Sequence, residues 1–431
     1  MHKLVVCLLV CAATAPAQQA KNYKDAAEYN LYESVVKDID AGGFAKAVAD
    51  LDAWKTRYGE SDFKQEREFF YVLAYAGTNQ PDKVIDLSTD LLANGSLDAA
   101  KQVRVLYSAA TAIQQIPNPT EQQLATASKA ARDLAAFDKT PDGIAPDAWA
   151  STLIQLQTTA HGALLYVALL PGAQALRKND CAGAESALRK ALDEFPESAQ
   201  AAGYLGETWM CLYKTDRQRA PFAIYEFARA ASLDPAKGMA DPKWQQQTVE
   251  PALERLYTSY HGADPEGLRQ LKELAVKSPL PPEGFSIDSA AQIAQRKQAD
   301  FEAKNPELAL WLRIKAALTA ADGDQYFASD LDGVDMPQLK GILIEAKPAC
   351  RPTELRVAVP SLDTKPPFLP EIDLKLEKPL AGRPDLNGEI RWEGTGAAFT
   401  KAPFLLTVKT AKEKIQGLNF RPCTTSPITR K

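Results

Sequence analysis

Histidine and cysteine are the residue types that could supply a nucleophile, a general base or a soft metal ligand, and both are scarce. The chain of 431 residues has three histidines and six cysteines. Beyond the first seventeen residues only His161 and His261 remain, each followed by glycine in a helical pattern. A hydrolase needs a nucleophile with a base held beside it. We therefore expect no enzymatic activity and no catalytic residue, and we interpret His261 as a cation favoured at a helix C-terminus.

Two other motifs could bind ions, and each departs from its pattern. Asp330-x-Asp332-Gly333-x-Asp335 lacks the ligand at the fifth position of an EF-hand loop, and its glycine is misplaced. We interpret this acidic run, residues 322–335, as a solvated turn between domains. "GTGAAF", residues 394–399, lacks the third glycine and the following helix of a phosphate loop, so we interpret it as a connection between strands.

No bound metal or cofactor is expected either. The chain has no CxxC pair, and two histidines are too few for the usual zinc clusters. Stacking on a sugar is a weak alternative, because Trp54, Trp209 and Trp392 fall at positions expected to be buried.

The first seventeen residues, "MHKLVVCLLVCAATAPA", have the three parts of a secretory signal peptide. Lys3 supplies the basic start, an apolar run follows, and Ala15-Pro16-Ala17 is a small-residue exit. The apolar run is shorter than the roughly 20 residues that cross a bilayer. We expect cleavage before Gln18 and an exported protein, periplasmic or secreted, without a transmembrane segment.

A lipid anchor is the alternative to a soluble product, and it would use Cys7 or Cys11. Valine precedes both, whereas lipoprotein signals usually place a small residue there.

Cleavage of the signal peptide would also remove Lys3 and change the formal net charge from -5 to -6. This mild acidity argues against binding to nucleic acid, which requires a basic surface.

Residues 18–277 have a helical pattern in which apolar residues recur at spacings of three and four. A proline-rich connector, "SPLPPEGFS", and two more helices follow within 278–336. From 337 to 431 the apolar period becomes two, and about six short strands are expected. The fold class is thus mainly α, followed by a small β-barrel or sandwich. A glycine-containing first strand and the later "GEIRWEG" are compatible with an OB-like barrel. At this length two or more domains are expected.

The helical region resembles the tetratricopeptide repeat in its middle part. That repeat has the pattern L-G-x2-Y, then A-x3-F, then a closing proline. Small residues lie where its two helices cross closely, and proline ends the second helix. The matching residues are Ala184, Leu188, Ala191 and Pro196 in one copy, and Leu205, Gly206, Trp209, Ala223, Phe227, Ala230 and Pro235 in the next.

Other parts of the helical region resemble the repeat less. Residues 42–54 and 71–92 are weaker copies, and the hairpins at 97–137 and 242–277 are of uncertain kinship. An irregular helical bundle remains the alternative to a solenoid of stacked antiparallel pairs.

The resemblance also suggests how the remaining four cysteines pair. An even count in an exported protein indicates two disulfides. In a tetratricopeptide array the helices on either side of Pro196 run antiparallel, so Cys181 and Cys211, each fifteen residues away, would face each other. Two buried free thiols are the alternative. Cys350 and Cys423 flank the first and last expected strands, and a bond between them would join the two ends of the β-domain.

The whole chain is similar to a group of uncharacterised exported bacterial proteins with a divergent tetratricopeptide solenoid and a small C-terminal β-domain. The similar stretches are "NPELALWLRIKAALTAADGDQYF", "AKPACRPTEL" and "AFTKAPFLLTV". The resemblance implies export and a modular binding architecture. We expect a non-enzymatic scaffold that binds a protein or extended peptide on the concave face of the solenoid. The alternatives are binding of a small molecule or glycan by the β-domain, and an accessory subunit of an envelope enzyme complex.

Overall fold

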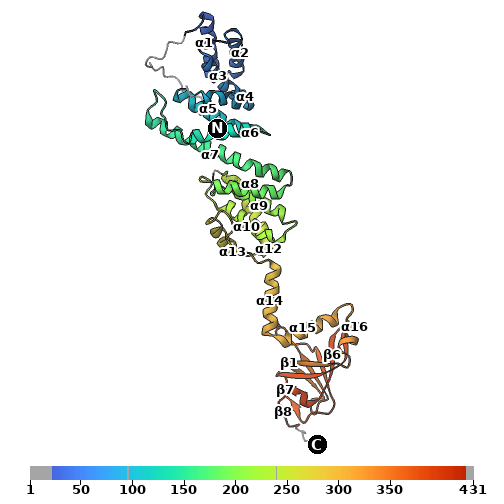
Figure 1. The fold of residues 1–431 in the computed structure, drawn as a ribbon. Coiled ribbons are helices and arrows are strands. Elements are labelled where there is room, and N and C mark those ends of the chain that lie inside the picture. The colour runs from blue at the N-terminus through green and yellow to red at the C-terminus, as the bar shows by residue number, and fades with distance from the viewer. Residues whose placement is uncertain (1–21, 95–96, 239, 424–431) are drawn as a thin grey trace, which may run out of the picture. The chain divides into compact units, whose positions relative to one another are not determined.

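A computed structural model describes residues 22–94, 97–238 and 240–423 (Figure 1). The expected signal peptide, residues 1–17, lies outside this part of the chain. The structure divides into two compact units, one up to Ile287 and one from Asp288 onward. The stretch 278–336, expected as one connecting segment, is therefore shared between both units.

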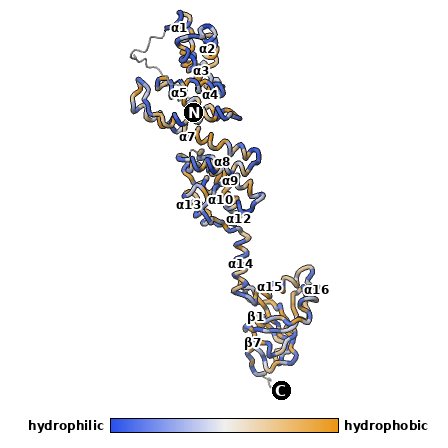
Figure 2. Tube along the Cα trace, viewed as in Figure 1, coloured by the Kyte–Doolittle hydropathy of each residue, from blue (hydrophilic) through white to orange (hydrophobic). Residues whose placement is uncertain are grey.

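The first unit is helical throughout, and apolar and polar residues are interspersed along its helices (Figure 2). Its elements are α1 (Ala26–Asp40), α2 (Phe44–Arg57), α3 (Lys64–Gly77), α4 (Pro81–Ala93), α5 (Ala99–Ala112), η1 (Ile113–Gln115), α6 (Glu121–Ala135), α7 (Pro146–Arg177), α8 (Cys181–Glu194), α9 (Ala199–Leu212), η2 (Arg217–Arg219), α10 (Ala220–Ser232), α11 (Pro242–Trp244), η3 (Gln245–Val249), α12 (Glu250–His261) and α13 (Pro265–Ala275).

Packing in this unit is sequential. From α1 to α10 each helix contacts the next one, and α12 and α13 both pack on α10. The odd-numbered helices α1, α3, α5, α7 and α9 also contact one another in succession. Helices that are first in their hairpins thus form a row of their own.

Three of the hairpins are closed by the same turn geometry. Gly42, Asn79 and Asn179 have φ of 73°, 55° and 56°, in the left-handed region. Each lies two residues before the first residue of α2, α4 or α8, respectively. Glycine and asparagine tolerate this conformation better than other residues. The hairpins α1–α2, α3–α4 and α7–α8 therefore share one turn conformation.

The residues that resemble the tetratricopeptide pattern lie where α9 crosses α10. A methyl group placed on Gly206 would lie 3.2 Å from the ring of Phe227, closer than an ordinary contact. Gly172 of α7 lies thirty-four residues before Gly206 and makes a similar close crossing. A methyl group placed on Gly172 would lie 2.5 Å from Cγ of Leu188 on α8. Both hairpins therefore need glycine where the helices are closest, and Trp209 is buried beside the second crossing.

Helix α7 corrects one expectation. Residues 164–170 form an apolar run between Gly162 and Pro171, which reads from the sequence as a short buried helix, but α7 is a continuous helix of 32 residues that passes through both. Pro171 is on the exposed side, and α7 packs against α6 and α8 along its length, which offsets the hydrogen bond that proline cannot make. In the described chain, α7 is the one helix long and apolar enough to cross a membrane, by length and composition alone.

The second unit begins with helices that contribute to the core of the β-domain. Its elements before the sheet are α14 (Ala290–Lys304), α15 (Pro306–Thr319), α16 (Gly323–Tyr326) and the π-helix η4 (Phe327–Leu331). Trp311 of α15 is fully buried with the strand residues, and its Nε1 donates to Glu371 at 2.8 Å. The acidic run is therefore not a solvated turn between domains: it forms α16, η4 and the start of the first strand, because Leu331 anchors it in the core.

The sheet of the second unit is a closed five-stranded barrel. Strands pair in the order β1-β2-β3-β6-β5, and β5 pairs again with β1; β3 and β6 are parallel, and the other barrel pairs are antiparallel. The strands are β1 (Asp335–Lys347), β2 (Glu354–Ala358), β3 (Ile372–Leu376), β4 (Arg383–Pro384), β5 (Glu389–Lys401), β6 (Phe404–Thr410), β7 (Ile415–Gln416) and β8 (Phe420–Arg421), with η5 (Lys412–Lys414) before β7.

Two details of the barrel bear on the sequence predictions. "GTGAAF" is not a connection between strands but part of β5, which continues to Lys401, and Gly394 and Gly396 face neighbouring backbone too closely for a side chain. Trp392 is buried in the barrel core, as predicted. The Cys350–Cys423 disulfide, with Cα atoms 5.9 Å apart, joins the loop after β1 to the segment after β8.

Candidate functional site

A pocket of about 350 Å³ lies between α7 and α9, two neighbouring helices in the row of first helices. We call it the α7–α9 pocket. Its apolar floor is made by Leu165, Leu169 and Leu170, which are almost fully buried. The remaining lining residues are Gln114, Gly162, Tyr166, Ala173, Arg177, Gln200 and Tyr204.

Five polar side chains converge on this floor. They are two amides, two phenols and one guanidinium, contributed by Gln114, Gln200, Tyr166, Tyr204 and Arg177. No hydrogen bond or ion pair joins any of these side chains to another residue in the described part of the chain. Gln114, Arg177 and Tyr204 are exposed and Tyr166 and Gln200 are half-buried, so solvent reaches these groups and they are available to a ligand. A group of convergent polar side chains without internal partners, above an apolar floor, is typical of a ligand site.

The pocket extends along one face of α9. Gln200, Tyr204, Glu207 and Cys211 follow one another at spacings of three and four residues, so they share a helix face. Glu207 is exposed, yet burial by the surrounding protein raises the pKa of its carboxyl above the usual value. A side chain that reaches solvent while remaining crowded by protein is expected on a recessed surface.

The same combination of polar, partly buried side chains occurs on α5, which precedes α7 in the row of first helices. Arg104, Tyr107 and Gln114 lie along one face of this segment. Arg104 and Tyr107 are half-buried, and desolvation lowers the pKa of Arg104 and raises the pKa of Tyr107. These polar residues therefore extend the recessed face beyond the pocket.

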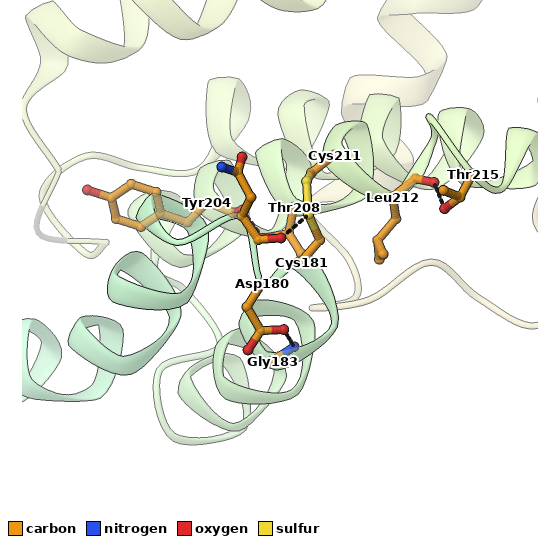
Figure 3. The surroundings of a disulfide bond; sticks show 9 residues. Asp180, Cys181, Gly183, Tyr204, Thr208, Cys211, Leu212 and Thr215 are labelled. Carbon is orange, nitrogen blue, oxygen red and sulfur yellow. Dashed lines mark hydrogen bonds between the residues drawn. A yellow bond between two sulfur atoms is a disulfide. The ribbon is translucent and has the colours of Figure 1, made fainter.

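The Cys181–Cys211 disulfide borders this face (Figure 3). Cys181 is the first residue of α8, Cys211 is in the last turn of α9, and their Cα atoms are 6.1 Å apart. Both predicted pairs, Cys181–Cys211 and Cys350–Cys423, are present in the structure. Because Cys211 shares a face with Tyr204, the disulfide holds the helix that presents the polar side chains.

A second polar cluster lies close by but is internally paired. The carboxylate of Glu185 accepts hydrogen bonds from Trp209 Nε1 at 3.0 Å, Arg189 Nη2 at 3.0 Å and Arg219 Nη1 at 3.1 Å. Burial opposes ionisation of Glu185, but these donors lower its pKa below the usual value. This cluster holds α8, α9 and η2 together, and its charges are paired internally.

The residues predicted from the repeat pattern are not the residues that line the pocket. Ala184, Leu188, Ala191, Leu205, Trp209, Ala223 and Ala230 are buried between helices. Pro196 and Pro235 follow the ends of α8 and α10. The pocket residues were missed because polar positions on a helix surface carry no motif. The thirty-four-residue shift from Gly172 to Gly206 relates Tyr166 to Gln200 and Leu170 to Tyr204, and it is the signal that could have located them.

The two histidines have no catalytic surroundings in the described residues. His161 is exposed on α7. His261 is the last residue of α12, and its Nε2 lies 3.5 Å from Asp264 Oδ2, which agrees with a role at the helix end. No group of three or more His, Cys, Asp or Glu side chains that could hold a metal ion is found in the described ranges.

The outer surface of the barrel is polar but paired. Across β1, β2 and β3 six alternating charges form what we call the charged face: Glu345, Lys347, Glu354, Arg356, Asp373 and Lys375. Lys375 Nζ lies 2.5 Å from Glu354 and 3.1 Å from Asp373, and Arg356 lies 3.1 Å from Glu345. These charges neutralise one another, so the face offers little to a charged ligand, although Asp373 Oδ1 and Arg356 Nε are buried without a hydrogen-bond partner in the described chain.

No protein-family model matches this sequence, and no curated protein is significantly similar to it.

Proposed function

We propose that this chain is an exported, non-enzymatic binding protein, and that the α7–α9 pocket and the adjoining faces of α5 and α9 bind an extended peptide or a segment of a partner protein. The observation that carries the proposal is the convergence of five polar side chains without internal partners on an apolar floor. Amides and phenols can both donate and accept hydrogen bonds, which suits the alternating donors and acceptors of a peptide backbone.

The finer assignment of the first unit is a tetratricopeptide-like solenoid. Three features support it: the row formed by the first helices, the repeated left-handed turn, and the glycines at the closest crossings of α7–α8 and α9–α10. In a solenoid each repeat contacts its neighbours, and the row of first helices provides an extended binding surface. The paired cysteines support export, because disulfides persist in oxidising compartments.

The β-domain is the second candidate for a contact surface. Its strand order, with β3 parallel to β6 and a long β1 that pairs on both sides, supports an OB-like barrel. The loop between β2 and β3 exposes Leu362 and Leu369 by 68% and 79%. Binding of a glycan or charged small molecule is less well supported, because the charged face is internally neutralised.

Selection of a random peptide library displayed on phage tests the proposal. The full-length protein serves as bait, and the double variant R177A/Y204A removes one cation and one phenol from the pocket. Lys178 is exposed and adjacent to Arg177 but does not line the pocket, so K178A is the matched control. We expect the wild type and K178A to enrich the same peptides and R177A/Y204A to lose them. Equal enrichment by all three proteins, or none by the wild type, would contradict the proposal.

A further inference from the structure

The proline-rich segment after α13 is fastened to α10. We call residues 276–287 the strap. Arg229, itself buried, donates from Nη1 to Ala275 O at 2.8 Å and to Ser278 O at 2.9 Å, and from Nη2 to Pro196 O. Tyr225 donates its hydroxyl to Ser278 O at 3.0 Å, and its ring packs edge-on against Phe285. The strap therefore has a defined seat, held mainly by two side chains of one helix.

A second pocket lies beneath the strap. It has a volume of about 390 Å³ and is lined on the helix side by Arg189, Trp209 and Phe222. The strap supplies the opposite wall through residues 280–285. Removing the strap from its seat would expose this aromatic surface, so the strap is positioned as a lid.

A buried carboxyl lies on the face of α10 to which the strap is fastened. Phe222 lines the pocket and Arg229 contacts the strap, and Glu226 shares their helix face at spacings of four and three residues. Glu226 is fully buried, and neither of its carboxyl oxygens has a hydrogen-bond partner in the described chain. An ionised carboxylate in such a place is strongly disfavoured.

The charged groups that act on Glu226 are Arg229 on its own helix and Arg189 on α8. Burial raises the pKa of Glu226 well above its usual range, and the attraction of these two cations opposes the shift without cancelling it. The Nη1 and Nη2 atoms of Arg229 donate to the carbonyls of Ala275, Ser278 and Pro196, of which Ser278 belongs to the strap. Its Nε, like both carboxyl oxygens of Glu226, has no hydrogen-bond partner in the described chain.

We propose that the strap is a proton-controlled latch: the protonated carboxyl of Glu226 permits the closed seat, and loss of this proton releases the strap and opens the pocket below it. In the open state water reaches the carboxyl, whose pKa then returns toward the ordinary value of about 4.3. The closed state is therefore favoured at low pH. Opening increases as the pH rises from that value to the raised pKa, by about tenfold per pH unit for one proton, and levels off above it.

Hydrogen–deuterium exchange of the full-length protein tests the latch. The protection of strap amides, corrected for the intrinsic pH dependence of exchange, is measured between about pH 5 and pH 8. We expect protection in the wild type to fall by up to about tenfold per pH unit in the titrating range. In E226Q, which cannot ionise, protection should be high and independent of pH. Glu283 is exposed on the strap itself, so E283Q is the matched control and should retain the wild-type dependence.

Constant protection in the wild type, or the same fall in E226Q, would overturn the proposal. If E226Q does not fold, E226M, which is also uncharged, replaces it. Y225F provides an independent measurement, because it removes one hydrogen bond to Ser278 O. It should lower strap protection about two- to tenfold at every pH and leave the pH dependence unchanged. Unaltered protection in Y225F would show that the hydrogen bond from Tyr225 to Ser278 O does not hold the strap, and the latch depends on that contact.

Discussion

The α7–α9 pocket and the charged face of the barrel are both polar surfaces, but they differ in how their side chains are paired. On the charged face Lys375 meets Glu354 and Asp373, and Arg356 meets Glu345. In the pocket the side chains of Arg177 and Tyr204 form no hydrogen bond or ion pair with another described residue. Residue type does not distinguish the two surfaces. The comparison teaches that a side chain left without an internal partner is the better indicator of binding.

The largest expected effect concerns the disulfides, which stabilise the two regions independently. In the chain-entropy model, C181A/C211A should lower the free energy of unfolding of the first unit by about 3–4 kcal/mol, and C350A/C423A should lower that of the barrel by about 4 kcal/mol. Denaturant titration, followed by exchange of amides in each unit, measures both. If either pair of substitutions destabilised both units equally, the two regions would not be energetically separate.

Loss of a partner on the charged face should have the next largest effect. Asp373 is 5% exposed, and K375A leaves its carboxylate without the ammonium group 3.1 Å away. We expect a cost of about 1–3 kcal/mol in the free energy of unfolding. Lys409 is the register partner of Lys375 on β6, but it is exposed and has no ion pair in the described chain, so K409A is the control and should change stability by less than about 0.5 kcal/mol. If K375A left the free energy of unfolding unchanged, the ion pairs on this face would not be stabilising.

Substitutions in the pocket should barely change stability. Because the side chain of Arg177 is exposed and makes no internal hydrogen bond, R177A should alter the free energy of unfolding by less than about 0.5 kcal/mol, although it reduces peptide enrichment. Thermal or denaturant unfolding of the variants used in the selection provides the measurement. A loss above 1.5 kcal/mol in R177A would indicate a structural role and would weaken the contrast with the charged face.

The smallest effect is expected at Glu207, and its sign follows from the raised pKa of this carboxyl. Because the pKa is higher in the folded state than in the unfolded state, the folded state retains its proton more strongly. Stability is thus lost as the pH rises from the unfolded value through the folded pKa. E207Q should be slightly more stable than the wild type at neutral pH and equal to it in acid. Melting temperatures across this range measure the difference, with E197Q, an exposed residue just before α9, as the control. A lower stability of E207Q at neutral pH would contradict a recessed position.

Some features of this protein follow from local sequence alone. Spacings of three, four and two residues predicted helices before residue 277 and strands after 337, because the apolar face of an element must meet a core at the period of that element. Pro196 and Pro235 marked helix ends because proline cannot continue the hydrogen-bond ladder. The even count of cysteines suggested two disulfides: the symmetry of Cys181 and Cys211 about Pro196 in a repeat-like hairpin predicted one, and the positions of Cys350 and Cys423 beside the first and last strands predicted the other. Each of these inferences depends on chain chemistry within one or two elements.

Other features were decided by tertiary contacts. Glycine and proline disfavour the interior of a helix, yet α7 runs through Gly162 and Pro171 while packed on α6 and α8. "GTGAAF" resembled a turn, yet pairing with β6 extends it as a strand. The prolines of the strap suggested a free connector, whereas Arg229, about fifty residues earlier, fastens it. The pocket itself depends on which polar side chains find partners and which do not, and that is a property of atoms brought together from distant helices, which no local pattern contains.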